Sequence, residues 1–171
     1  LSPYGLDSKI EDLAKDGLCD LYKLKTVNCP EAISLMKEHQ VNMGISINCR
    51  NIIKKEIINY FDTPIFNLHD SYLPDERGGA LNSWRILNSI NEVGNTLHHL
   101  DEGIDTGDIV LQEKTLLNKK YPYPIDYLKA ETENCRKILS EFIELLKNNK
   151  NINAIKQEND KSYYYPRLHT E

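Results

Sequence analysis

The sequence predicts an α/β fold in which a mostly parallel sheet carries helices on both faces. Short apolar runs alternate along the chain with amphipathic segments of helical spacing, which is the pattern of repeated strand and helix units. The length of 171 residues suits one domain with a buried core. Charged residues make up 27% of the chain, which is typical of a folded globular protein.

Helices and strands alternate in the N-terminal half of the sequence. Ile10, Leu13 and Ala14 recur at helical spacing. Asn28 and Glu31 have the spacing of a capping box, which predicts that a helix begins there. In this half we expect a helix at 8–16, a strand at 21–27, a helix at 30–39, a strand at 43–47 and a helix at 52–61.

The same alternation continues in the C-terminal half. Pro64 ends the preceding helix and begins a short apolar run, 64–68, which predicts a buried strand. A loop rich in turn-forming residues follows at 70–79. Beyond this loop we expect a helix at 80–90, strands at 95–100 and 108–112, and a long amphipathic helix at 125–146.

Polar residues lie where the predicted strands end. Asn67 and His69 fall at the end of the strand 64–68, and Asp105 falls in the loop between the next two strands. Ligands bind beyond the carboxyl ends of the strands in such sheets, so we expect these three residues to meet. Residues two apart on a strand point to the same side, which directs Asn67 and His69 toward one pocket.

These side chains fit oxyanion and proton-transfer chemistry. An amide N–H stabilises a developing oxyanion, and an imidazole donates a hydrogen bond or carries a proton. A carboxylate beside an imidazole orients the ring. Each residue alone also has a structural interpretation, in which His69 satisfies a loop carbonyl and the acids are solvated or cap a turn. The candidate carboxylates are Asp101, Glu102, Asp105 and Asp108.

The sequence gives little support to a metal site, a serine hydrolase or a nucleotide-binding loop. His98 and His99 are adjacent, so on a strand they point to opposite faces and do not easily bind one metal ion. The signatures of serine hydrolases, P-loops and dinucleotide-binding turns are absent from the sequence. We therefore expect no metal site. Arg77-Gly78-Gly79 fits either an anion-binding cradle or an ordinary surface turn.

Composition narrows the range of partners. The chain has 21 basic and 26 acidic residues and a net charge of −5, whereas proteins that bind nucleic-acid phosphates usually carry a basic excess. No apolar run reaches the ~20 residues that span a bilayer, and no signal peptide is visible. The four cysteines form no C-x-x-C pair. We expect a cytoplasmic protein with reduced thiols and no membrane partner.

Two longer motifs resemble those of the folate-dependent formyltransferase family. The segment 66–74, FNLHDSYLP, is similar to the family's Asn-x-His-x-Ser-x-Leu-Pro signature, and Arg77-Gly78-Gly79 and Trp84 follow at the familiar distance. The segments 94–98, GNTLH, and 101–108, DEGIDTGD, resemble the second signature. The resemblance covers about residues 25 to 145 and implies the family's formyltransferase fold, with its Rossmann-like sheet.

The resemblance implies a role for each matching residue. Asn67, His69 and Asp105 are the implied catalytic residues, and 10-formyltetrahydrofolate is the implied formyl donor. Asn67 and His69 would stabilise the oxyanion that forms when an amine attacks the formyl carbon, and Asp105 would orient His69. The implied donor-binding residues are Arg50, Asn51, Ile52, Leu73, Pro74, Asp101, Glu102, Gly103 and Ile104. The residues expected on the acceptor side are Ser71, Tyr72, Arg77, Gly78, Gly79 and His98.

The chain departs from the family pattern in its first signature and at its start. Asp70 follows His69 where many members have Pro, and Tyr72 replaces a common Leu. We expect both differences to affect which acceptor binds more than the formyl-transfer chemistry. The family's usual first strand and helix are not recognisable, so we expect the protein to start earlier. We expect a catalytic domain at 1–150 and a C-terminal extension at 151–171.

The acceptor is the least determined part of the prediction. Glycinamide ribonucleotide enzymes of the family usually read Leu-Asp-Gly-Gly where this chain has Ile104-Asp105-Thr106-Gly107. Methionyl-tRNA enzymes share Asp-Thr-Gly but carry an added C-terminal domain that helps to bind tRNA. The favoured acceptor is the amino group of a nucleotide-linked sugar used for surface polysaccharide such as lipopolysaccharide. Methionyl-tRNA formylation, formyltetrahydrofolate hydrolysis, a folate-binding module without turnover and a homodimeric assembly stay open.

Overall fold

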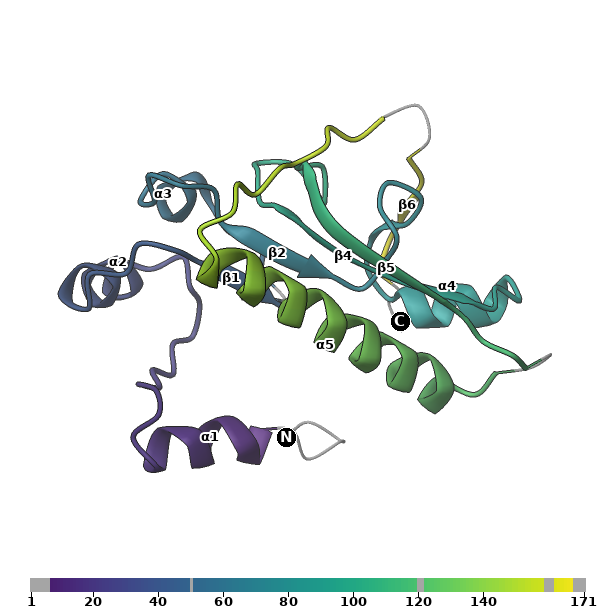
Figure 1. Cartoon of the computed structure of the whole chain (residues 1–171), viewed down its shortest axis with the longest axis horizontal. Coiled ribbons are helices and arrows are strands. Elements are labelled where there is room, and N and C mark those ends of the chain that lie inside the picture. Colours follow the sequence, from purple (N-terminus) through teal and green to yellow (C-terminus); the bar gives the residue numbers. More distant parts are fainter. Residues whose placement is uncertain (1–6, 50, 120–121, 159–161, 168–171) are drawn as a thin grey trace.

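The computed structural model describes residues 7–49, 51–119, 122–158 and 162–167 (Figure 1). Among the helices in these ranges, none is both long enough and apolar enough to cross a membrane. In chain order the elements are α1 (Asp7–Lys15), α2 (Pro30–Glu38), β1 (Ile45–Ile47), α3 (Lys55–Ile58), β2 (Phe66–His69), β3 (Arg77–Gly78), α4 (Leu81–Leu87), β4 (Glu92–His99), β5 (Ile109–Leu116), α5 (Pro124–Lys147) and β6 (Tyr164–Tyr165).

The main sheet has the strand order β1-β2-β4-β5, and helices pack against it, so the α/β class is confirmed. The expectation of a mostly parallel sheet is wrong, because in the main sheet of the described residues β1 and β2 run parallel, whereas β2–β4 and β4–β5 are antiparallel. Parallel neighbours need a long crossover connection. The loop 100–108 instead joins β4 directly to β5. The connection from β2 to β4, which includes the short α4, is not a crossover, because β4 runs antiparallel to β2.

Two other predicted elements differ from the structure. The segment 21–27 is irregular and is not a strand, because it has no neighbouring strand in the described part of the chain. Its Leu24 and Val27 pack against a small apolar cluster, while Leu21 and Tyr22 remain exposed. The predicted helix at 52–61 is reduced to the four residues of α3.

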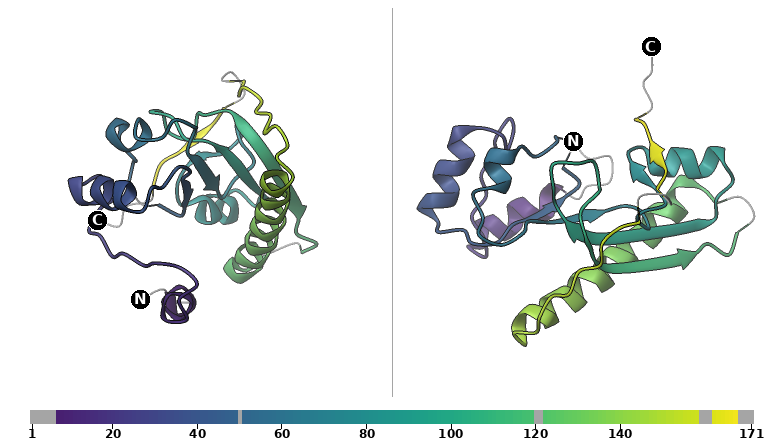
Figure 2. Two further views of the ribbon diagram at one scale, coloured as in Figure 1. Left: turned by 60° about the vertical axis from the view of Figure 1, so that its left-hand side comes forward. Right: turned by 90° about the horizontal axis from the view of Figure 1, so that it is seen from above.

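The core lies between α5 and one face of the sheet. Phe142 and Ile138 of α5 pack against Phe66, Leu68 and Leu97, and the rings of Phe142 and Phe66 are 4.7 Å apart. Figure 2 shows α5 lying along that side of the sheet. Side chains alternate along a strand, so this packing turns the intervening polar residues of β2 toward the opposite face.

Phe142 is expected to be a large single contributor to stability. Its side chain is 0% exposed, and its removal would leave a cavity between α5 and β2. We expect Phe142→Ala to lower the free energy of unfolding by about 3–5 kcal/mol, measured by urea denaturation. The control is Ile143→Ala, one residue along α5 and 46% exposed, which should cost less than about 1 kcal/mol. Equal costs for the two variants would contradict this account of the core.

After α5 the chain turns back along the sheet (Figure 1). Ile155 forms an isolated antiparallel bridge with Ile109 at the start of β5. Farther on, β6 pairs in parallel with β3, and the ring of Tyr165 lies 5.6 Å from that of Trp84 in α4. This returning segment therefore contacts the loop that follows His69 and the loop between β4 and β5.

Candidate active site

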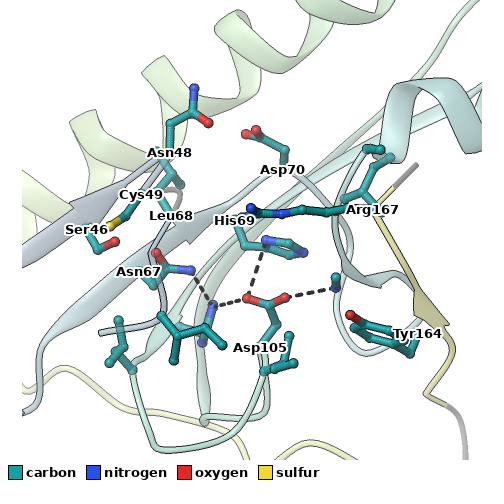
Figure 3. Close-up of a pocket in the computed structure, with 18 of the residues that line it drawn as sticks. Ser46, Asn48, Cys49, Asn67, Leu68, His69, Asp70, Asp105, Tyr164 and Arg167 are labelled. Carbon is teal, nitrogen blue, oxygen red and sulfur yellow. Dashed lines mark hydrogen bonds and ion pairs between the residues drawn. The ribbon is translucent and has the colours of Figure 1, made fainter. Parts of the chain in front are cut away.

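A pocket lies over the polar face of the sheet, on the side away from the main core. Its volume is about 950 Å³, which is within the range of small-molecule binding sites. Asn67, His69 and Asp105 all line it, although they come from two distant parts of the sequence (Figure 3). The chain thus brings together the amide, the imidazole and the carboxylate that the sequence singled out.

Strand register explains how the floor of this pocket forms. Ser46 on β1 pairs with Asn67 on β2, and Asn67 pairs in turn with His98 on β4. Paired residues on neighbouring strands project from the same face. Three polar side chains therefore form one row across three strands, and all of them line the pocket.

Hydrogen bonds determine the orientation of the Asn67 amide. His98 Nδ1 lies 2.7 Å from the carbonyl oxygen of His99, which can only accept, so Nδ1 carries the proton. Burial of the ring, together with the nearby charge of His69, lowers the pKa of His98 to about 4, and the ring is neutral at pH 7. Its Nε2 must then accept from Asn67 Nδ2 at 3.1 Å. The second N–H of that amide group remains for a ligand.

The lowered pKa of His98 predicts a specific dependence of stability on pH. In an unfolded chain a histidine has a pKa of about 6.5. The folded state holds the proton more weakly, so the stabilisation is fully present above about pH 6.5 and is lost as the pH falls toward 4. We expect the free energy of unfolding to lose on the order of 3 kcal/mol from this residue over that window.

The measurement compares wild type with His98→Gln by urea denaturation at several pH values. Glu131, whose pKa burial raises to about 7, titrates in the same window with the opposite sign, but it does so in both proteins. The difference between the two proteins therefore isolates His98. It should shrink as the pH falls from 7 to 4, and a constant difference would refute the assignment of a buried neutral ring.

His69 is held by contacts on both of its ring nitrogens. Nε2 donates to the carbonyl oxygen of Glu76 at 3.2 Å, and Nδ1 lies 3.6 Å from Asp105 Oδ1. A singly protonated ring can donate to only one of these two acceptors, whereas a second proton would be shared with the Asp105 carboxylate. The geometry therefore places Nδ1 against the Asp105 carboxylate.

Asp105 adopts an unusual backbone conformation and uses both carboxylate oxygens. Its φ is 54°, in the left-handed region that Asp tolerates better than most residues. Oδ2 accepts from the backbone N–H of Gly78 at 2.9 Å, which leaves Oδ1 directed at His69. Gly78 itself has a φ of 102°, and any side chain there would strike the carbonyl oxygen of Tyr165.

A buried arginine fixes the loop that follows His69. The Arg85 side chain donates to the Glu76 carboxylate at 2.6 Å, to Glu131 at 2.9 Å and to the carbonyl oxygen of Asp70 at 2.7 Å. Burial also raises the pKa of Asp70. Because the Glu76 carbonyl accepts from His69, Arg85 contributes indirectly to the position of the imidazole.

The predicted donor-binding residues separate into two groups. Leu73 is buried and bonded to Thr96 and Gln112, and neither Leu73 nor Pro74 lines the pocket. Glu102 also lies outside the pocket lining, and its carboxylate pairs at 2.8 Å with Lys55. The pocket lining does include Asn51, Ile52, Asp101, Gly103 and Ile104. Arg50 lies outside the described residues.

The predicted acceptor residues separate in the same way. Gly78, Gly79 and His98 line the pocket. Ser71 and Arg77 are buried beside it and do not line it, because their segment packs against the sheet and the returning chain. Tyr72 lines a separate cavity of about 210 Å³, where the Lys114 ammonium lies 4.4 Å from the centre of its ring.

Sequence reasoning missed several residues of the site. Ser46 lines the pocket, is 7% exposed, and its hydroxyl has no hydrogen-bond partner among the described residues. Gln157 hydrogen-bonds the Asp105 loop from a segment with no regular pattern. For Ser46 a signal existed, since the strand 43–47 places it opposite Asn67, but nothing in the sequence marked Gln157. No group of three or more His, Cys, Asp and Glu side chains within the described ranges is placed to hold a metal ion.

The fold is of the α/β class with a small-molecule-sized pocket over its sheet, and comparison with known proteins gives its family. Residues 8–123 match the family described as "Formyl transferase", so the chain belongs to the formyl transferase family. It is 33% identical over 136 residues to a methionyl-tRNA formyltransferase from Caldicellulosiruptor saccharolyticus, a match that covers 80% of this chain and 42% of that protein. The chain thus spans less than half of the length of that relative.

Solved structures confirm the formyltransferase fold. An N-formyltransferase from Helicobacter canadensis, in complex with folinic acid and dTDP-3-aminofucose, is 30% identical with a TM-score of 0.62, and the match covers 72% of this chain and 44% of that one. The formyltransferase PseJ from Anoxybacillus kamchatkensis, in complex with a UDP-linked formamido sugar and tetrahydrofolate, is 25% identical with a TM-score of 0.65. That match covers 93% of this chain and 80% of PseJ.

Proposed function

We propose that this protein transfers a formyl group from 10-formyltetrahydrofolate to a primary amine. The observation that carries the proposal is the gathering of Asn67, His69 and Asp105 around one pocket in a member of the formyl transferase family. A pure binding module would not need an amide, an imidazole and a carboxylate lining one pocket, with the carboxylate beside the imidazole. Formyl transfer uses all three.

The pocket fits a folate donor in size and in its polar groups. The residues that would hold the donor are Asn51, Ile52, Asp101, Gly103 and Ile104, all of which line the pocket. The buried Ser46 hydroxyl supports a ligand here, because an unpaired buried hydroxyl is costly unless a bound group satisfies it. Both solved relatives named above were crystallised with a folate compound.

Each catalytic side chain has a distinct task in the proposed reaction. The free N–H of Asn67 donates to the formyl oxygen as negative charge develops there. His69 and Asp105 accept and pass on the proton that the amine loses when its nitrogen bonds to the formyl carbon. The bond from that carbon to N10 of the folate then breaks, and N10 gains one proton.

We further propose that the amine belongs to a nucleotide-linked sugar. Tyr164 and Arg167 line the pocket beside the catalytic residues and would offer an aromatic face and a guanidinium to a base and a phosphate (Figure 3). The two solved relatives, which contain sugar nucleotides, support the same acceptor. Methionyl-tRNA is the second candidate, because the relative from Caldicellulosiruptor saccharolyticus, which is 33% identical to this chain, is named a methionyl-tRNA formyltransferase.

The test mixes the protein and 10-formyltetrahydrofolate with a panel of acceptors, and the products are identified by mass. The panel contains nucleotide-linked amino sugars, glycinamide ribonucleotide and charged initiator tRNA. A formylated sugar nucleotide is expected. Formate release that needs no amine would indicate a hydrolase. Folate binding without turnover of any acceptor would indicate a binding module. Either result would refute the proposal.

A further inference from the structure

The Gln157 side chain lies under the loop that carries Asp105 and uses both ends of its amide. Nε2 donates to the backbone carbonyl oxygens of Asp105 at 3.0 Å and of Gly107 at 2.7 Å. Oε1 accepts two hydrogen bonds from the Arg77 guanidinium, at 3.2 and 2.7 Å. Gln157 is 6% exposed and does not line the pocket, so its contacts are with the protein and not with a ligand.

These contacts hold the backbone on both sides of the loop's sharp turn. Asp105 has a φ of 54°, a conformation that is costly for a residue other than glycine unless its surroundings hold it. Two carbonyl groups that are two residues apart must point toward one amide to receive both of its N–H groups. Gln157 therefore selects the loop conformation in which the Asp105 side chain enters the pocket.

Arg77 connects the same amide to the carboxylate by a second route. Arg77 is the residue before Gly78, whose N–H donates to Asp105 Oδ2 at 2.9 Å. The contacts form a closed circuit from Gln157 to Arg77, through the chain to Gly78, across to the Asp105 carboxylate and back through its carbonyl to Gln157. Backbone and side chain of Asp105 are thus held from the same point.

We propose that Gln157 is a positioning residue for Asp105. It holds the carboxylate between the Gly78 N–H and His69 Nδ1, and it acts from a segment outside residues 8–123, the part that matches the family. The catalytic meaning of this role rests on the proposed formyl transfer. The positional role itself does not, and it is measurable without substrate.

The decisive experiment follows amide hydrogen exchange by NMR in Gln157→Glu. This variant keeps the size of the side chain and the acceptor for Arg77, but it turns an oxygen toward the carbonyls of Asp105 and Gly107. Exchange of the Gly78 N–H should become about tenfold faster, because the carboxylate that accepts from it is no longer held. Gln157→Met, which has no amide, should give the same result if the charge of Gln157→Glu disturbs folding.

Neighbouring amides distinguish positioning from general loosening. The N–H groups of Arg77 and Gly79 donate to the carbonyls of Tyr163 and Tyr165 and report the pairing of β3 with β6. Their exchange should stay within about twofold of wild type. Unchanged exchange at Gly78, or an equal increase at all three amides, would overturn the proposal.

The matched control is Asn134→Asp, another buried amide that donates to a backbone carbonyl. Asn134 Nδ2 contacts the carbonyl oxygen of Val93 at 3.2 Å, and its Oδ1 accepts from Thr115, away from the pocket. This variant should lower stability without changing exchange at Gly78. A similar increase at Gly78 in Asn134→Asp would show that any buried amide has this effect, and would also overturn the proposal.

Kinetics then connect the position of Asp105 to turnover. With the acceptor found in the panel, Gln157→Glu should lower kcat about tenfold and leave KM for the folate unchanged. In an Asp105→Asn background the same change should cost less than about twofold, because the group that it positions is gone. A tenfold cost in both backgrounds would refute action through Asp105. If wild type formylates no acceptor while exchange at Gly78 responds as expected, the proposed function fails and the positional role stands.

Discussion

Replacing Asn67 with alanine is expected to lower kcat about 10²- to 10³-fold, the cost of losing one donor to a developing oxyanion. The Asn67 amide is held by His98 with one N–H directed elsewhere, so its orientation is set before any ligand binds. The loss should appear mainly in kcat and little in KM, because negative charge on the formyl oxygen exists only near the transition state. Steady-state kinetics with 10-formyltetrahydrofolate and the acceptor from the panel measure it.

A distant asparagine provides the control for this substitution. Asn148 caps the end of α5, where its amide donates to the carbonyl oxygen of Glu144 at 2.7 Å. Asn148→Ala should leave kcat within about twofold of wild type. An Asn67→Ala enzyme with near-normal kcat would refute the oxyanion role.

Replacing His69 with alanine is expected to have an effect of similar or greater size, about 10²- to 10⁴-fold in kcat. The ring bridges the Asp105 carboxylate and the Glu76 carbonyl, so its removal eliminates the path for the proton that leaves the amine. The fold should persist, because the main core lies on the other face of the sheet. Circular dichroism and urea denaturation check the fold, and single-turnover kinetics check the chemistry.

The control for His69→Ala is a histidine outside the pocket. His39 lies at the end of α2 and contacts the Tyr22 hydroxyl at 2.6 Å. His39→Ala should not change kcat. Normal turnover in His69→Ala would rule out proton transfer through this ring and would leave Asp105 without its partner in the reaction.

Local sequence pattern predicted the parts of this site that depend on a single strand. The alternation of β2 places Phe66 and Leu68 against α5 and turns Asn67 and His69 to the other face. That inference needed only a period of two and the apolar run at 64–68. Asp105 was singled out for a reason that does not hold, because β4 runs antiparallel to β2 and its last residue, His99, pairs with Phe66 and not with His69. The loop 100–108 instead folds back to place Asp105 beside His69.

Contacts between distant segments were not predictable in this way. Arg77 was expected on the acceptor side of the site, but it pairs with Gln157, 80 positions later in the chain. No periodicity relates the two residues, and β6, which follows Gln157, has only two residues. The antiparallel direction of β4 and β5 was not predicted for a related reason. An apolar run indicates a strand, but it does not show whether the next strand will run parallel or antiparallel to it.

The order in which the chain is made gives the link between Gln157 and Asp105 a further consequence. Synthesis proceeds from the N-terminus, and segments that are already complete can begin to fold before the rest exists. Strands β2, β4 and β5 can pair and cover α5 while residues after 150 are still to be added. A nascent chain at that stage would have the apolar core and the Asn67 amide in place. The loop 100–108, which carries Asp105, would reach its final conformation only after Gln157 had been synthesised and had bonded to it.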